Sequence, residues 1–461
     1  MAVNGNHVQS VAHHQKPPEA LRLGDKWLEF VGEGAANTIW AVHFVDDAGG
    51  DSFTRELRQL CQGYLLRILK DLSDGADSRY TAKEQLAYFE NAVLPAFDNQ
   101  RSLFVDQKLI HLRQDIIDEC NVLLTHMDEN QAASAQHRPL PHPHLPARRR
   151  KFVGTRVGPP GWHMLTEDMR PRGPFERFAE IKPKWLAQSP AAPPTAVLCR
   201  NCAIAAQRFT EAPDGQKPSK SDPAKYGCPL RLVAGPGPAL DPAIHMSHAT
   251  NLNGGHRTRA PNGNHASNGH AEKKPHAIKA EDDNDNADGW KAHAERIFRH
   301  QDPCDSHFLF WSIRRHHLLP HLRNLQNRLA GPGCADAFWA SSRDHPDPDL
   351  LLSMTLRDCS LFLRYEARPD GSLCMLDFKF ADLDRKVPTK VPRWQDMERR
   401  LVEGGWYEGK QQARPGPGEM VWPRCYLKEV REAGSMPDFD AVPVDLARLK
   451  DVSALGVPYL E

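Results

Sequence analysis

The chain has 461 residues with 59 basic and 59 acidic side chains, so its formal net charge is zero. A balanced charge gives no overall field that would attract nucleic acid or an anionic membrane, so any site for a polyanion must be local. No run approaches the roughly 20 apolar residues that cross a bilayer. Ten scattered cysteines and the absence of an apolar opening segment are typical of a reducing cytosolic or nuclear compartment without structural disulfides.

Two segments lack the composition of a folded core. Residues 1–20 are polar and rich in His and Gln, and residues 235–289 are rich in Gly, Pro, Asn and Asp. Neither can bury enough apolar surface to offset the conformational entropy lost on folding. We therefore expect a disordered N-terminal arm and a disordered insertion, with order beginning near Leu21.

The first ordered part begins with strand-like runs. Three runs rich in aliphatic, aromatic and β-branched side chains predict strands at residues 27–30, 38–44 and 64–69. Thr81 and Glu84 then have the spacing of a capping box, and apolar residues recur at helical spacing after them. Three strands followed by a helix predict an α+β opening.

A short glycine-containing turn separates the first two predicted strands. After Gly32 and Glu33 it reads Gly34, Ala35, Ala36 and Asn37. A turn between two strands does not fit a dinucleotide fold or a Walker loop, because both place the glycines before a helix. Small residues let backbone N–H groups approach phosphate oxygens, so the turn is a lid over phosphates or an ordinary hairpin. Similarly, Arg67 is a cation for nucleotide phosphates or a surface residue of an edge strand.

The segment Glu180–Lys184 presents two lysines together. In an extended segment Glu180, Lys182 and Lys184 share one face, and Pro183 restricts the backbone between the lysines. Neighbouring ammonium groups repel each other unless an anion lies between them, so this is an anion site or a solvated edge strand. Further cations for such a site are Arg200, Arg208, Lys386 and Lys390. The basic run at residues 148–151 is a nuclear localisation patch, part of the anion site or a solvated turn.

Cys199 and Cys202 form a single Cys-x-x-Cys pattern. A structural zinc site needs about four ligands, and no second pair stands at a suitable spacing. A redox motif would need βαβ surroundings, which the sequence does not indicate. We therefore expect two cysteines packed on a helix face and no structural zinc.

Two aspartates are expected to meet at the open end of a β-hairpin. Alternating apolar segments flank Pro369-Asp370-Gly371, which predicts an antiparallel hairpin. Asp358 and Asp382 lie equally far from Asp370, so strand pairing would bring their carboxylates together. One carboxylate can accept a proton from an attacking hydroxyl while the other holds Mg²⁺ on a nucleotide, as phosphoryl transfer requires. The alternative is two turn or helix-capping aspartates.

Together these segments resemble the inositol-pentakisphosphate 2-kinases, and fungal members of that family most of all. Glu180-Ile181-Lys182-Pro183-Lys184 matches the family's signature. The other matching segments, which occur in the family's order, are residues 32–37, 66–68, 357–360 and 382–386. The resemblance therefore covers most of the chain that is expected to be ordered.

The resemblance implies an α+β fold of the two-lobed inositol polyphosphate kinase type. An N-terminal lobe over residues 21–170 would contain the glycine turn in a β-hairpin, and a larger α/β C-terminal lobe over residues 171–461 would contain the insertion. The resemblance also implies an enzyme that uses ATP and Mg²⁺ to phosphorylate the 2-hydroxyl of inositol 1,3,4,5,6-pentakisphosphate, giving inositol hexakisphosphate (phytate).

Individual roles follow from the resemblance as well. Asp358 would be the base toward the 2-hydroxyl, assisted by Lys182, and Asp382 would bind Mg²⁺ with help from Asp384. The nucleotide would contact Gly34, Ala35, Ala36, Asn37, Arg67, Glu167 in the hinge that meets adenine, and Arg296. The inositol phosphates would contact Lys182, Lys184, Arg200, Arg208, Lys386 and Lys390.

Two other classes of protein are the rivals. A protein kinase needs His-Arg-Asp-x-x-x-x-Asn and Asp-Phe-Gly, and neither motif occurs. A non-catalytic module that binds inositol polyphosphates or nucleic acid would use the same lysines, but paired carboxylates disfavour a polyanion unless Mg²⁺ is present. We therefore expect a nuclear or cytoplasmic kinase, or one found in both, with no membrane and no direct nucleic-acid partner.

Overall fold

The computed structural model describes residues 26–44, 52–71, 80–212, 226–233, 285–410 and 425–432. Within these ranges the strands form two antiparallel sheets surrounded by helices, a mixed α+β arrangement that agrees with the sequence. The predicted arm at residues 1–20 lies outside the described residues. So does the predicted insertion as far as residue 284, whereas residues 285–289 open a helix, which corrects the expected boundary.

The larger sheet has the strand order β1-β2-β3-β6-β4, and β5 pairs with β3. Its first three strands confirm the three predicted runs. The core on this sheet includes Trp40, Leu66 and Leu165, and the helices α1 and α4 pack against it. The bounds are β1 (Lys26–Glu33), β2 (Asn37–Phe44), α1 (Ser52–Cys61), β3 (Tyr64–Asp71), β4 (Gln107–Leu112), α4 (Gln114–Ala135), β5 (Arg156–Val157) and β6 (Gly161–Glu167).

The predicted capping box is present at the start of helix α2 (Ala82–Tyr88). The Glu84 backbone N–H donates to Thr81 Oγ1 at 3.3 Å, and the Thr81 backbone N–H donates to the Glu84 carboxylate at 2.7 Å. The helical path continues through residues 89–93 into α3 (Leu94–Ala96). Phe89 and Val93 on this path are buried in the same core as the smaller sheet.

The smaller sheet consists of β7 (Glu176–Ile181), β8 (Ser360–Ala367) and β9 (Leu373–Ala381), with β8 in the centre. The hairpin of β8 and β9 turns at Gly371, whose φ of 83° requires the left-handed backbone that glycine adopts readily. Ser360 lies opposite Ala381, and an irregularity between Arg364 and Tyr365 shifts the register. The predicted hairpin is therefore correct, and both aspartates lie just beyond its paired ends.

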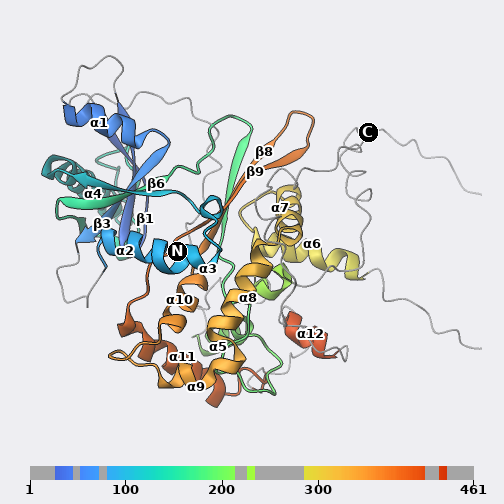
Figure 1. The fold of residues 1–461 in the computed structure, drawn as a ribbon. Helices are drawn as coiled ribbons and strands as arrows, with labels where there is room; N and C mark the ends of the chain where they lie inside the picture. Colours follow the sequence, from blue (N-terminus) through green and yellow to red (C-terminus); the bar gives the residue numbers. More distant parts are fainter. Residues whose placement is uncertain are drawn as a thin grey trace, which may run out of the picture.

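Some of the remaining helices pack against the smaller sheet, and the others form separate clusters beyond it. In Figure 1 the larger sheet with α1 and α4 occupies the left of the view, and α5 to α12 lie below and to the right. Their bounds are α5 (Arg200–Glu211), α6 (Asp285–Ile297), α7 (Pro303–Arg315), α8 (Leu318–Ala330), α9 (Ala335–Ala340), α10 (Pro348–Leu356), α11 (Val391–Glu403) and α12 (Tyr426–Glu432). Among the described residues, none of the helices combines the length and apolar character needed to cross a membrane.

Candidate functional site

The end of β7 and the open end of the β8-β9 hairpin meet at Lys182. Its Nζ donates to Asp382 Oδ2 at 2.5 Å and to the backbone carbonyl of Asp358 at 2.9 Å. Lys182 directly follows the last residue of β7, and Asp382 directly follows the last residue of β9. The two aspartates therefore come together at the hairpin mouth, with a lysine between them.

Two further lysines surround the Asp358 carboxylate. Lys386 Nζ lies 2.8 Å from Oδ2, and Lys184 Nζ lies 3.4 Å from Oδ1. Burial by itself would raise the pKa of Asp358, but the charges of Lys386 and Lys184 outweigh burial and hold the pKa below its ordinary value. The side chain is 50% exposed, so an ionised carboxylate faces solvent within a ring of cations.

A cation from the larger sheet reaches the segment that follows β9. Arg67 of β3 donates to Asp384 through Nη2, at 2.6 Å from Oδ1, and also contacts Oδ2. Burial would lower the pKa of Arg67, but Asp384 raises it, and the net change is upward. This ion pair connects the strand that carries the predicted phosphate cation with the segment that carries the predicted metal ligands.

The backbone is unusual at two residues of this cluster. Lys184 has a φ of 61° and Asp382 a φ of 56°, which is the left-handed region that residues other than glycine rarely adopt. β7 ends at Ile181, so residues 182–184 are not the extended segment that the sequence suggested. Both ammonium groups still contact Asp358, with Lys182 Nζ 2.9 Å from its backbone carbonyl oxygen and Lys184 Nζ 3.4 Å from Oδ1. Such conformations cost about 1 kcal/mol or more each and concentrate at functional sites.

The glycine turn connects two antiparallel strands, as the sequence predicts. The Gly34 backbone N–H donates to the carbonyl of Asn37 at 2.8 Å, and the carbonyl of Ala36 accepts from the Lys70 backbone N–H at 2.9 Å. Ala35 at its tip is exposed. Ile39, two residues after the start of β2, lies opposite Arg67 in β3. The turn is therefore close to the strand position that presents this cation.

Glu167 lies where the two sheets meet. It ends β6, and its carboxylate oxygens lie 2.6 and 2.8 Å from Nζ of Lys379 in β9. One of these oxygens also accepts from the Asp106 backbone N–H at 3.0 Å. A position between the sheets is compatible with a hinge, and contact with adenine remains a prediction.

Arg200 and Arg296 are not brought to the charge cluster. Arg200 is 8% exposed, its Nε donates to Glu398 of α11, and its guanidinium lies 3.9 Å from the ring centroid of Trp185. Arg200 is thus engaged in the interior, and its contact with an inositol phosphate stays a prediction. Arg296 is in the last turn of α6, close to Gly227. Its contact with the nucleotide stays a prediction.

Arg208 and Lys390 remain as cations with like-charged neighbours. Arg208 is exposed in the last turn of α5, where burial and the charge of Arg200 lower its pKa. Lys390 lies directly before α11, where burial and Lys386 lower its pKa, while Asp358 raises it. Lys386 and Lys390 do not share a helix, and both lie near Asp358.

Four cysteine thiols converge in a part of the fold away from the charge cluster. They belong to Cys199, Cys202, Cys228 and Cys425; all four are buried, and their Sγ atoms lie within 4.8 Å of one another. Cys199 Sγ and Cys228 Sγ are 3.8 Å apart. Four thiolates at about 2.3 Å from a tetrahedral zinc would be about 3.8 Å apart, whereas disulfide sulfurs are about 2 Å apart. This cluster conflicts with the expectation of no structural zinc, because Cys228 and Cys425 supply a second pair of donors.

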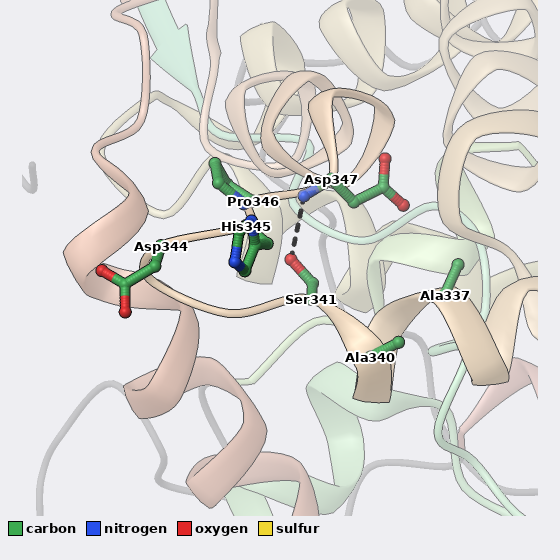
Figure 2. A pocket seen from close by; sticks show the side chains of 7 residues that line it. All are labelled: Ala337, Ala340, Ser341, Asp344, His345, Pro346 and Asp347. Atoms are coloured by element: carbon green, nitrogen blue, oxygen red, sulfur yellow. Dashed lines mark hydrogen bonds between the residues drawn. The ribbon is translucent and has the colours of Figure 1, made fainter.

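A separate surface pocket lies between α9 and the start of α10. Its lining includes Ser341 and Asp347, and the Asp347 backbone N–H donates to Ser341 Oγ at 3.0 Å (Figure 2). None of the predicted site residues lines it. This pocket is therefore distinct from the carboxylate and lysine cluster.

Comparison with known families agrees with the resemblance seen in the sequence. A family model described as inositol-pentakisphosphate 2-kinase matches residues 30–400, and the chain belongs to this family. A curated relative, the inositol-pentakisphosphate 2-kinase of Yarrowia lipolytica (strain CLIB 122 / E 150), is 26% identical over 230 residues. That alignment covers 50% of this chain and 53% of the relative, so the chain spans about half the length of the curated relative.

The lowered pKa of Asp358 predicts how stability changes with pH. Its ordinary value is about 3.9, so a carboxylate with a lower pKa in the folded state contributes stability that is present above about pH 4 and lost as the pH falls through the folded value. Lys386→Met should raise the folded pKa of Asp358 toward its unfolded value, so less stability should be lost on acidification and the loss should be complete at a higher pH. Urea unfolding between about pH 3 and pH 7 measures it.

Asp358→Asn supplies the control for this experiment. If Lys386 acts through the Asp358 charge, Asp358→Asn alone and Asp358→Asn combined with Lys386→Met should change in unfolding free energy with pH in parallel. Identical profiles for the wild type and Lys386→Met in the presence of Asp358 would contradict the assignment.

Proposed function

We propose that this protein is an ATP- and Mg²⁺-dependent kinase that phosphorylates the 2-hydroxyl of inositol 1,3,4,5,6-pentakisphosphate to give inositol hexakisphosphate. The observation on which the proposal depends is the meeting of Asp358 and Asp382 at Lys182. Membership of the family and the name of the Yarrowia relative support it. In this proposal residues 21–170 form the nucleotide lobe and residues 171–461 the inositol phosphate lobe of a kinase-like fold.

Asp358 is the group proposed to accept the proton of the attacking hydroxyl. Its carboxylate is half exposed, and Lys386 and Lys184 favour its charged form, so it is available as a base at neutral pH. The same lysines would bind substrate phosphates on either side of the reacting hydroxyl. Lys182, which donates to the Asp358 carbonyl, would hold the base in place and neutralise charge in the transition state.

Asp382 and Asp384 are proposed to hold Mg²⁺ on the nucleotide. The donor set fits, because carboxylate oxygens are the hard ligands that Mg²⁺ prefers and both residues lie in the short segment after β9. When bound, the ion would neutralise charge on the transferring phosphate. Arg67, which now pairs with Asp384, would be free to turn toward phosphate oxygens, while Lys182 keeps its contact with the Asp358 carbonyl.

The other nucleotide contacts are proposed to come from the larger sheet. Arg67 and the turn of residues 34–37 would meet the phosphates through a guanidinium and through backbone N–H groups. Glu167 would lie beside adenine, at the place where β6 meets β9. Lys184, Lys386, Lys390 and Arg208 would contact the inositol phosphates, and binding should weaken as salt concentration rises.

A non-catalytic module for inositol polyphosphates is the alternative, and the aspartates argue against it. Placing carboxylates among the lysines of a polyanion site reduces its attraction for anions. That arrangement is useful only if one carboxylate takes a proton and another holds a cation.

Replacing Asp358 separates binding from chemistry. We expect Asp358→Asn to lower kcat by a factor on the order of 10² to 10⁴, because a positioned general base contributes about that much. Binding of inositol pentakisphosphate should be kept or tightened, because a negative charge is removed from its site. Steady-state kinetics and calorimetric titration of the pentakisphosphate measure the two effects.

Asp370→Asn is the matched control, because Asp370 lies at the exposed tip of the same hairpin and its carboxylate accepts hydrogen bonds from Ser372 within the turn. This variant should have wild-type kinetics. Near wild-type turnover of Asp358→Asn would remove Asp358 from the mechanism.

We also propose that Cys199, Cys202, Cys228 and Cys425 bind a structural Zn²⁺. A closed set of four buried thiols is typical of a structural rather than a catalytic site. The donors come from the start of α5, from the segment at 228–232 and from the residue before α12, which are far apart in the sequence. The ion would therefore cross-link parts of the chain that also share an apolar cluster around Leu198, Leu230 and Tyr407.

Metal analysis tests the zinc proposal. We expect about one zinc per chain in protein purified without chelator, and Cys228→Ser should lose it and unfold at a lower temperature. Cys304→Ser is the control, because Cys304 is exposed and outside the cluster. Protein with four titratable buried thiols and no metal after purification and zinc addition would contradict the proposal.

A further inference from the structure

A buried group of charges lies behind the glycine turn, on the opposite side of β3 from Arg67. Arg67 and Lys70 are three residues apart in the strand, so their side chains leave opposite faces. Lys70 Nζ lies 2.8 Å from Glu33 Oε2 and 3.8 Å from the ring centroid of Phe152. The side chains of Lys70 and Glu33 are only 1% and 4% exposed.

Arg148 completes this group. Its side chain is fully buried, with Nε 3.2 Å from Glu33 Oε1 and Nη2 2.8 Å from Glu33 Oε2. Nη1 also donates to Asp128 of α4 at 3.0 Å and to the carbonyl of Thr155 at 2.9 Å. The Arg148 guanidinium therefore links the end of β1 to α4 and to Thr155, the residue before β5. Because it is buried, Arg148 is neither a solvated residue nor an accessible contact for a targeting receptor.

The group holds the glycine turn from both ends. Glu33 is the residue before Gly34. Its carboxylate forms an ion pair with Lys70 and accepts two hydrogen bonds from the Arg148 guanidinium. At the other end of the turn, the Lys70 backbone N–H donates to the carbonyl of Ala36. A buried carboxylate with two cationic partners is strongly fixed, because leaving any member without its partner in the interior is unfavourable.

We propose that Glu33, Lys70 and Arg148 are positioning residues for ATP, which hold the turn of residues 34–37 in its phosphate-binding conformation before the nucleotide arrives. The inference rests on the proposed function, in which this turn meets the ATP phosphates. A turn of glycine and alanine has many conformations when unrestrained, so ordering it costs conformational entropy. If the turn is already ordered before ATP binds, this entropy cost does not reduce the binding free energy. None of the three side chains belongs to the proposed inositol phosphate contacts, so their effect should fall on ATP.

Arg148→Lys and its neighbour Arg150→Lys form a matched pair for the test. Arg148→Lys keeps a positive charge but removes the bidentate contact, whereas Arg150 is exposed. We expect Arg148→Lys to raise KM for ATP about tenfold, and Arg150→Lys to leave it unchanged. At saturating ATP, kcat and KM for inositol pentakisphosphate should stay near wild-type values in both variants.

Glu33→Gln repeats the comparison with a residue of the same shape, in case Arg148→Lys does not fold. An unchanged KM for ATP in both Glu33→Gln and Arg148→Lys would overturn the proposal. So would a loss of kcat and of affinity for both substrates in parallel with a lower melting temperature, which is the result of a merely structural role. If the wild type transferred no phosphate to the pentakisphosphate, the proposed function would fail by itself, and calorimetric titration of ATP with Mg²⁺ would still compare the variants.

Discussion

The ammonium group of Lys182 holds the candidate site together. It is 10% exposed and donates both to the Asp382 carboxylate and to the Asp358 carbonyl, so it joins the end of β7 to both sides of the β8-β9 hairpin mouth. Burial would lower the pKa of Lys182, but Asp382 raises it, and the amine stays charged. Lys184 and Lys386 can then gather around Asp358, and Arg67 can reach Asp384 from the larger sheet, because the hairpin mouth has a fixed place.

The charges at this site are paired within the protein. Three carboxylates are paired with Arg67 and with three lysines from two segments, residues 182–184 and residue 386, so none of these four cations needs a ligand to be satisfied. A nucleotide with its metal and a highly phosphorylated inositol would exchange these pairs for stronger ones. A chain with zero net charge can therefore bind polyanions locally, and salt should affect binding more than folding. The buried pairing of Glu33 with Lys70 and Arg148 serves another purpose, because it shapes the turn and has no route to a ligand.

The sequence predicts those features whose causes are local. The hairpin at Gly371 and the capping box at Thr81 depend on residues within a few positions of each other, and both are present. Features that depend on distant partners could not be predicted. Glu398, which takes Arg200 into the interior, and Cys425, which completes the four thiols, come from segments that only folding brings near. The left-handed backbone at Lys184 likewise breaks the alternation that periodicity assumes, although the lysine still reaches Asp358. The role of Arg148 is ambiguous in the sequence, because a run of basic residues does not indicate which of its side chains is buried.

Phosphate transfer to the substrate tests the central claim most directly. The purified full chain would be incubated with Mg²⁺, ATP labelled in its terminal phosphate, and inositol 1,3,4,5,6-pentakisphosphate, and the inositol products would be separated and the labelled position determined. The proposed function, with Asp358 and Asp382 acting together at Lys182, predicts a single labelled product, inositol hexakisphosphate with the label at position 2. Label that stays in ATP or appears only as free phosphate, with the pentakisphosphate unchanged, would contradict it.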